Sequence, residues 1–184
     1  MISVYEHIRD IPYAIIPELR YPVNGPAGIL EKGYGSCIPK HFLLAAMFGR
    51  LGIPVKFATY PFKWGDPAIN YPPDIRNMVK ELPTTYHLAC KARIGAAWRL
   101  VDATWDPPLK RANFPVNEDW DGESDTNNAV TPFEEVLHDS LDDRLRYESS
   151  RKTLYTEKEK AAYERFIPAL NAWLKTLRSL KNSP

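Results

Sequence analysis

Seventeen prolines limit where this chain can form regular structure. Proline lacks a backbone N–H and has a fixed φ, so it interrupts helices and the inner strands of sheets. The prolines cluster in residues 12–26, 61–83 and 107–115, which we therefore expect to be loops. Helices and strands are left to the stretches between and after these clusters, so the sequence predicts compact elements joined by long connections.

The first regular stretch predicts a buried helix that begins at Cys37. Ser36 is a good N-cap residue, and Pro39 falls in the first turn, where its missing N–H costs little. Apolar residues then recur at helical spacing. The segment 49–52, which has a glycine at each end, provides the stop.

Three later segments alternate apolar and polar side chains, as half-buried strands do. They cover residues 55–60, 86–94 and 97–105. The last two are separated by Gly95 and Ala96, which predicts a hairpin with a two-residue loop.

In this hairpin register, Ala89 faces Asp102, and His87 lies diagonal to Asp102 on the same face of the sheet. Diagonal neighbours are roughly 7 to 8 Å apart at the backbone. Two side chains that lean toward each other can close this gap, so we expect a hydrogen bond between His87 and Asp102.

The C-terminal part, about 131–181, predicts two helices. After a loop rich in Asn, Asp and Gly at 113–128, Thr131–Glu134 combines an N-cap Thr, a Pro at the first position and a Glu at the third. The second helix opens with a capping box at Thr156–Glu159 and carries an apolar stripe. We interpret both helices as packing elements.

Composition indicates one soluble globular domain over 1–184, with its core at about 25–110. The 24 Lys and Arg residues against 23 Asp and Glu give a net charge of +1, so no strong field would hold a polyanion and we expect no nucleic acid partner. The N-terminus has no signal-peptide pattern, and nowhere do about eighteen apolar residues run together. We therefore expect no membrane contact and a cytoplasmic location.

Two cysteines, Cys37 and Cys90, are too few for a disulfide framework and fit a reducing compartment. Cys90 lies on the apolar face of its predicted strand, which is typical of an inert core cysteine. Cys37 stands at a helix start, where the positive end of the macrodipole and unpaired N–H groups stabilise a thiolate. Cys37 is therefore the candidate nucleophile.

Three segments in this order resemble the transglutaminase-like superfamily. They are Gly35-Ser36-Cys37 before an apolar helix that ends in Leu51-Gly52-Ile53-Pro54-Val55, then His87, then Asp102 within Trp98–Thr104. Each piece alone is weak. Together they fall on the elements that the family uses and cover roughly residues 30–110.

The resemblance implies an α+β, papain-related fold, in which a central helix bearing the cysteine packs on an antiparallel sheet, with the C-terminal helices as additions. It also implies a triad in which Cys37 attacks a peptide or protein amide, His87 transfers the protons and Asp102 orients the imidazole. No cofactor is implied. Hydrolysis by an amidase or peptidase is favoured over transamidation because water is always present as an acceptor, and the oligomeric state stays open.

Two features of the family pattern are missing from this chain. Ala89 stands two residues after His87, where the family commonly has an aromatic residue, and no Gln lies just upstream of Cys37 to help hold an oxyanion. The candidates for a second oxyanion donor are Trp64, Asn24 and Tyr34. The residues predicted to line a substrate cleft are Trp64, His41 and Tyr34.

Two alternatives stay open. One is a peptide- or protein-binding module that keeps the fold without turnover, which an unreactive Cys37 would favour. The other is a structural zinc site, because Cys37, His41, His87 and Cys90 make up a Cys2His2 set. Residues three apart on a strand point to opposite faces, which counts against the zinc site.

Overall fold

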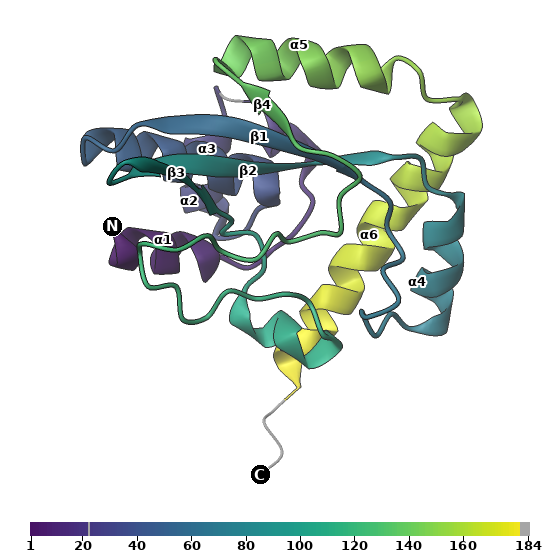
Figure 1. The fold of residues 1–184 in the computed structure, drawn as a ribbon. Coiled ribbons are helices and arrows are strands. Elements are labelled where there is room, and N and C mark those ends of the chain that lie inside the picture. Colours follow the sequence, from purple (N-terminus) through teal and green to yellow (C-terminus); the bar gives the residue numbers. More distant parts are fainter. Residues whose placement is uncertain (22, 181–184) are drawn as a thin grey trace.

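The computed structural model describes residues 1–21 and 23–180 as an α+β structure built on a four-stranded antiparallel sheet (Figure 1). The strands are β1 (Val55–Phe62), β2 (Thr85–Ile94), β3 (Ala97–Val101) and β4 (Val136–His138). They lie in the order β3-β2-β1-β4, and each neighbouring pair is antiparallel. The predicted α+β class and the antiparallel sheet are confirmed.

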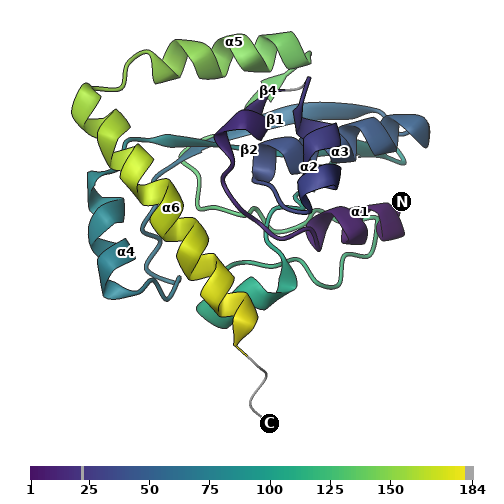
Figure 2. The ribbon, with the colours of Figure 1, turned by 180° about the vertical axis from the view of Figure 1, so that it is seen from behind.

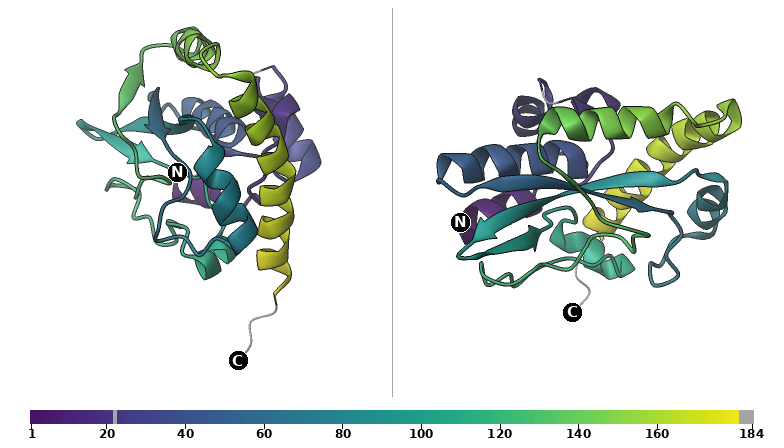
Figure 3. Two further views of the ribbon diagram at one scale, coloured as in Figure 1. Left: turned by 90° about the vertical axis from the view of Figure 1, so that its right-hand side faces the viewer. Right: turned by 45° about the horizontal axis from the view of Figure 1, so that its top comes forward.

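Helices cover one face and one end of this sheet. They are α1 (Ile2–Arg9), α2 (Gly25–Lys32), α3 (Cys37–Arg50), α4 (Pro73–Met78), α5 (Leu141–Lys152) and α6 (Glu157–Ser179), with 3-10 turns at Pro17–Arg20, Val79–Glu81 and Pro107–Ala112. Helices α1, α2 and α3 lie together on one face, with α3 against β1 and β2 (Figure 2). Helix α6 runs past the end of the sheet beside α4, and α5 lies along β4 (Figure 3).

Part of the opposite face of the sheet is covered by the long connection between the 3-10 turn at Pro107–Ala112 and β4. Its backbone joins the sheet where Thr126 N–H donates to Leu100 O at 3.0 Å. Further along this connection, Val130 packs against a buried cluster that includes Ala58 and Ala89. One face of the sheet therefore carries helices, and the other is covered in part, with Trp98 and Leu137 left exposed.

The predicted hairpin register is confirmed, but β3 is shorter than expected. Ile94 pairs with Ala97 across the two-residue loop, and the ladder ends where Cys90 pairs with Val101 instead of continuing to Trp105. The next three backbone N–H groups donate to side chains, namely those of Thr126, His41 and Asp102. The strand ends here because these side chains take the place of a strand partner.

Strand β1 continues through Pro61 to Phe62, beyond the end that the sequence predicts. Proline is tolerated in a strand where its missing N–H is not needed by a neighbour. The carbonyl of Pro61 accepts a hydrogen bond from Phe133 N at 2.9 Å, so its main chain faces a segment that lies outside β4. No regular ladder bond is therefore lost at Pro61.

The helix predicted to begin at Thr131 is wrong. Pro132 instead forms an isolated bridge with Phe62, and β4 follows and pairs with β1. The chain becomes helical only at α5, where the Ser140 side chain accepts a hydrogen bond from Asp143 N at 3.1 Å. A capping pattern is a local signal. The edge of β1, which is distant in the sequence, offers this segment backbone hydrogen bonds that the pattern does not reveal.

The starts of two predicted helices are confirmed. Helix α3 begins at Cys37 with Ser36 as its N-cap, and α6 opens with the capping box formed by Thr156 and Glu159. Helices α2 and α4 overlap segments that were predicted to be loops, and each has a proline in its first turn, where proline suits a helix. Residue 181 of the predicted C-terminal part lies outside the described residues.

The buried side chains form two large clusters. One lies between α1, α3 and the sheet and includes Tyr5, Phe48 and Cys90. The other lies around α6 and is rich in aromatic residues, such as Trp64 and Phe166. Within the described part of the chain, no helix combines the length and the apolar character that a bilayer span requires.

Candidate active site

Cys37 is the first residue of α3 and faces the region where the helix start meets the sheet. Its side chain packs with Ile38, Phe42 and Leu88 and is only 9% exposed. The side chain of the N-cap residue Ser36 makes no capping hydrogen bond. No capping side chain therefore occupies the first-turn N–H groups, and the positive end of the helix dipole acts directly on the thiol.

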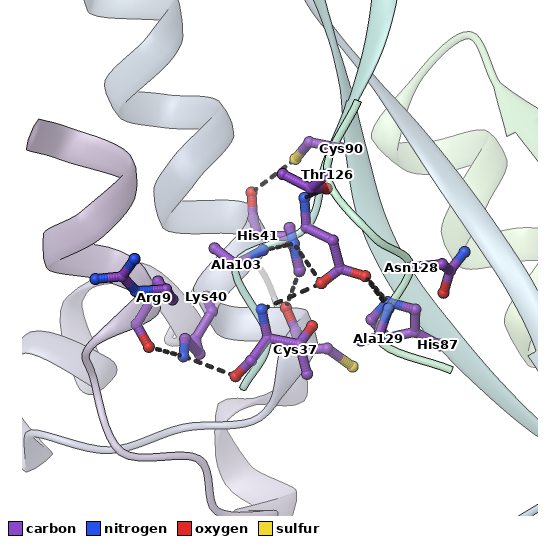
Figure 4. Close-up of polar contacts among 12 residues, drawn as sticks. Arg9, Cys37, Lys40, His41, His87, Cys90, Ala103, Thr126, Asn128 and Ala129 are labelled. Atoms are coloured by element: carbon purple, nitrogen blue, oxygen red, sulfur yellow. Dashed lines mark hydrogen bonds and ion pairs between the residues drawn. The ribbon is translucent and has the colours of Figure 1, made fainter. Parts of the chain in front are cut away.

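His87 lies on β2 between Cys37 and Asp102. Its Nε2 donates to Asp102 Oδ2 at 2.8 Å, and its other ring nitrogen is left for the hydrogen bond with the Cys37 thiol. Figure 4 shows the Cys37 sulfur beside the His87 ring. The structure thus joins the three predicted triad residues in one chain of contacts, and the predicted hydrogen bond between His87 and Asp102 is present.

The thiol and the imidazole shift each other's proton equilibria. Burial opposes ionisation of Cys37, but the hydrogen bond and charge of His87, together with the backbone N–H of Leu88, lower the pKa of the thiol below its ordinary value. Burial also disfavours the imidazolium, but Asp102 and Cys37 outweigh it and raise the pKa of His87 to about 10. Both shifts favour transfer of the thiol proton to the imidazole, which gives a thiolate beside an imidazolium.

Asp102 is held in place by backbone groups of two segments. Its Oδ2 accepts a hydrogen bond from Ala129 N at 2.8 Å, and its Oδ1 accepts one from Thr104 N at 3.1 Å. Burial alone would raise the pKa of this carboxyl, but the adjacent His87 holds it well below its usual range. Asp102 is therefore a fixed carboxylate, suited to orienting the imidazole.

A second histidine, His41, lies on the other side of Asp102, with Nε2 3.6 Å from Oδ1. Its Nδ1 is 2.8 Å from Cys37 O, to which it donates, and its Nε2 accepts a hydrogen bond from Ala103 N at 3.0 Å. Burial lowers the pKa of His41 to about 4, so the ring is neutral at pH 7. His41 thus ties the helix that carries Cys37 to the segment that carries Asp102.

Cys90 lies behind the triad in the core. Its thiol donates to His41 O at 3.4 Å, and burial raises its pKa well above the ordinary value. It is a buried core thiol, as its place on the apolar face of the predicted strand indicates. Among the described residues, no group of three or more His, Cys, Asp or Glu side chains is arranged to hold a metal ion.

A cavity of about 370 Å³ opens beside Cys37 and His87. Its lining includes Trp64, as predicted for the cleft, but includes neither His41 nor Tyr34. His41 is fully buried behind the triad, and Tyr34 is 41% exposed. The indole N–H of Trp64 is buried and has no hydrogen-bond partner among the described residues.

Sequence reasoning missed the far wall of this cavity. Tyr13 and Tyr163 both line it, and so do Arg20 and Lys152. Burial raises the pKa of both tyrosines, and the negative charge of Cys37, which lines the same cavity, raises it further. No sequence pattern could have identified these four residues, because they come from a proline-rich loop and from α5 and α6.

No family model matches this chain, and no curated protein or solved structure gives a significant match.

Proposed function

We propose that this chain is a cysteine-dependent acyl hydrolase of the transglutaminase-like type, which cleaves a peptide or protein amide through a thioester on Cys37. The observation that carries the proposal is the chain of contacts from Cys37 through His87 to Asp102 at the wall of a cavity. Thiolate, imidazolium and carboxylate in this order are the machinery of cysteine acyl transfer.

In the first half of the reaction, the Cys37 thiolate attacks the amide carbonyl carbon and the oxygen becomes an oxyanion. The His87 imidazolium then gives its proton to the leaving nitrogen as the C–N bond breaks. The products of this step are a free amine and a thioester on Cys37. Asp102 keeps the imidazole in the orientation that serves this transfer, because it holds Nε2 while the other nitrogen faces the thiol.

In the second half, neutral His87 takes a proton from water, and the water oxygen attacks the thioester carbonyl. The C–S bond breaks, the acid leaves, and the thiolate beside a protonated imidazole is restored. An amine in place of water gives an amide instead, so transamidation uses the same residues. Hydrolysis is preferred here because water is always available.

Trp64 is the candidate donor to the oxyanion. It lines the cavity together with Cys37, and its buried indole N–H has no partner in the described part of the chain. A buried polar group without a partner is costly, so such groups are uncommon unless a ligand or a transition state uses them. The Cys37 backbone N–H at the start of α3 is the second donor in this proposal.

The papain-related fold belongs to the same proposal. Its support is a helix that begins at the nucleophile and packs on an antiparallel sheet whose neighbouring strands carry His87 and, just past the end of β3, Asp102. This is the arrangement that the family resemblance implies. The C-terminal helices α5 and α6 are additions to it, and α6 supplies part of the cavity wall.

The test measures alkylation and acylation of Cys37. In a Cys90→Ala protein, the rate of reaction with iodoacetamide is followed against pH, with and without His87→Gln. We expect half-maximal rate well below pH 9.0, the ordinary thiol pKa. With His87→Gln the midpoint should move upward, because burial of the thiolate is then no longer offset by the imidazolium.

The same proteins are then mixed with p-nitrophenyl acetate, and their intact masses are recorded. We expect one acetyl group on Cys37, removable by hydroxylamine as a thioester is, and slow release of acetate by water. A reactive thiolate that never turns over would favour the binding module. Ordinary thiol behaviour, or stoichiometric zinc in the purified protein, would overturn the triad.

A further inference from the structure

A cluster of charged side chains lies at the cavity wall next to the triad. The Glu148 carboxylate on α5 forms ion pairs with three cations, Arg20, Arg144 and Lys152. The Arg20 Nη2 to Glu148 Oε1 distance is 2.9 Å. One carboxylate cannot neutralise three cations, so this cluster keeps an excess of two positive charges.

Arg144 is the innermost member of the cluster and is fully buried. Its Nε and Nη2 atoms have no hydrogen-bond partner among the described residues. Burial lowers the pKa of Arg144, and the negative charges of Glu148 and Cys37 oppose this shift. A buried guanidinium with free donors is costly unless an anion approaches it.

Cations also outnumber acids among the lining residues. Arg20, Lys152 and Lys160 line the cavity together with one acid, Glu164, and Lys160 pairs with exposed Glu157 outside the lining. Most of the remaining lining is apolar or aromatic; it includes Tyr13, Ile15, Phe62, Trp64, Trp105 and Tyr155. Because apolar walls exclude water, the field of the excess cations is weakly screened inside the cavity.

The volume limits the size of what enters. At about 370 Å³ the cavity is near the lower end of the roughly 300 to 1,000 Å³ typical of small-ligand pockets. It has room for a group of about one or two amino-acid residues, whereas a folded protein surface would have to stay outside. The occupant is thus a small amide or the end of a peptide.

We infer that the part of the substrate that enters this cavity carries a carboxylate, which pairs with Arg20 and Lys152 while its amide carbonyl lies at Cys37. This inference rests on the proposed function, since it assigns the substrate class of the same site. Arg144 supports the anion from behind the wall. Neutral peptide ends of the same size are poorer occupants because they leave the excess positive charge unpaired.

The test compares an anionic and a neutral reagent at one sulfur. Iodoacetate and iodoacetamide react in the same way: the Cys37 thiolate forms the C–S bond and iodide leaves. The ratio of their rates is independent of the thiolate fraction, so it reports the local field alone. It is measured in Cys90→Ala protein, alone and with Arg20→Gln, Lys152→Gln or both.

Lys56→Gln is the matched control, because it removes the same charge from a lysine that pairs with exposed Asp139 and does not line the cavity. We expect the iodoacetate-to-iodoacetamide ratio to fall about threefold to tenfold in each cavity variant and further in the double variant. Lys56→Gln should leave the ratio unchanged. High salt should reduce the wild-type ratio and have less effect on the double variant.

A protection experiment identifies the kind of anion that the cavity binds. N-acetylglycine, its neutral amide and inorganic phosphate are each tested for slowing the reaction of Cys37 with iodoacetamide. We expect N-acetylglycine to protect and the amide to protect much less. Stronger protection by phosphate would overturn the assignment of a carboxylate.

The two proposals fail in different ways. An unchanged ratio in the cavity variants, with Cys37 still activated by His87, would overturn the anionic substrate and leave the acyl chemistry standing. A Cys37 that reacts slowly with both reagents would overturn the proposed function itself. Thermal unfolding of each variant shows whether loss of the ion pairs with Glu148 has changed the fold instead.

Discussion

Two cysteine–histidine pairs lie on either side of Asp102, and the pKa values of their members are shifted in opposite directions. Cys37 and His87 are at the cavity wall, whereas Cys90 and His41 are in the core behind it. All four side chains are buried. Burial therefore does not distinguish the two pairs, and the difference must come from their hydrogen-bond partners.

The histidines show this most clearly, because both lie close to the same carboxylate. His87 donates directly to Asp102 and contacts a thiol, and these partners raise its pKa to about 10 despite burial. His41 has a backbone partner at each ring nitrogen, and burial lowers its pKa to about 4 because the charge of Asp102 offsets the effect of burial only in part. His87 is therefore charged and His41 neutral at pH 7, although both rings lie next to Asp102.

The cysteines follow the same rule. Cys37 has an imidazolium and the Leu88 N–H as partners, which lower its pKa. Cys90 is buried against a carbonyl and apolar neighbours, none of which stabilises a thiolate, so burial raises its pKa. Reactivity is thus assigned by the neighbours of each group, and four substitutions can break or sharpen the contrast.

The largest effect is expected for Asp102→Asn, which removes the charge that the two pairs share. The pKa of His87 should fall toward its ordinary value, and the rate of Cys37 acylation by p-nitrophenyl acetate should drop by about 10²- to 10⁴-fold. Asp139→Asn, at a 92% exposed carboxylate, is the matched control and should keep the wild-type rate. Equal acylation rates in both variants would show that the carboxylate has no part in the chemistry.

His41→Ala tests whether the rear pair is structural. It removes the bonds to Cys37 O and from Ala103 N, and it leaves the latter N–H buried without a partner. We expect the free energy of unfolding to fall by about 2 to 4 kcal/mol in urea titrations. The thiol pKa should remain lowered in the folded protein, since His87 is untouched. A thiol pKa that returns to normal would mean that His41 acts on the thiolate as well.

Trp64→Phe tests a further contrast between the two sides of Asp102. On the cavity side, the indole N–H of Trp64 has no hydrogen-bond partner among the described residues, whereas on the core side both ring nitrogens of His41 have one. The substitution keeps an aromatic ring but removes the indole N–H. We expect stability to change little and acylation of Cys37 to slow about tenfold or more, as for loss of an oxyanion donor. The pH midpoint of iodoacetamide alkylation serves as the control and should not move. An unchanged acylation rate would exclude Trp64 as that donor.

The smallest effect is expected for Cys90→Ala. It removes one buried sulfur and a weak hydrogen bond, which costs on the order of 1 kcal/mol of stability. The rates of alkylation and acylation at Cys37 should stay within about twofold of wild type. Losses of activity comparable to those of Cys37→Ala would show that the two thiols act together, as metal ligands do.

Much of the triad could be predicted from the sequence because each part rests on a local pattern. Ser36 and Pro39 define a helix start, so Cys37 is placed at its first turn. Gly95 marks a two-residue loop, and strand alternation then places His87 and Asp102 on one face. These inferences need only the geometry of a few consecutive residues, and the structure bears them out.

Other parts depended on contacts that no local pattern encodes. The segment that follows Thr131 pairs with β1 instead of forming the helix that its capping signal predicts. Pairing at the sheet edge gives it backbone hydrogen bonds that a single helical turn cannot match. His41 looked like a cleft residue on its helix, but the chain after β3 folds over it and Ala103 N donates to its Nε2, while its Nδ1 donates to Cys37 O within α3.

The sequence by itself predicted that Cys37, His87 and Asp102 come together, along with the helix start and the hairpin register that carry them. Only the tertiary structure decided what surrounds them: the cavity, the unpartnered Trp64 and the cations Arg20 and Lys152. The physical reason is distance along the chain. Local spacing sets where a side chain lies on its own helix or strand, but α5 and α6 reach the start of α3 through packing alone, across more than a hundred residues.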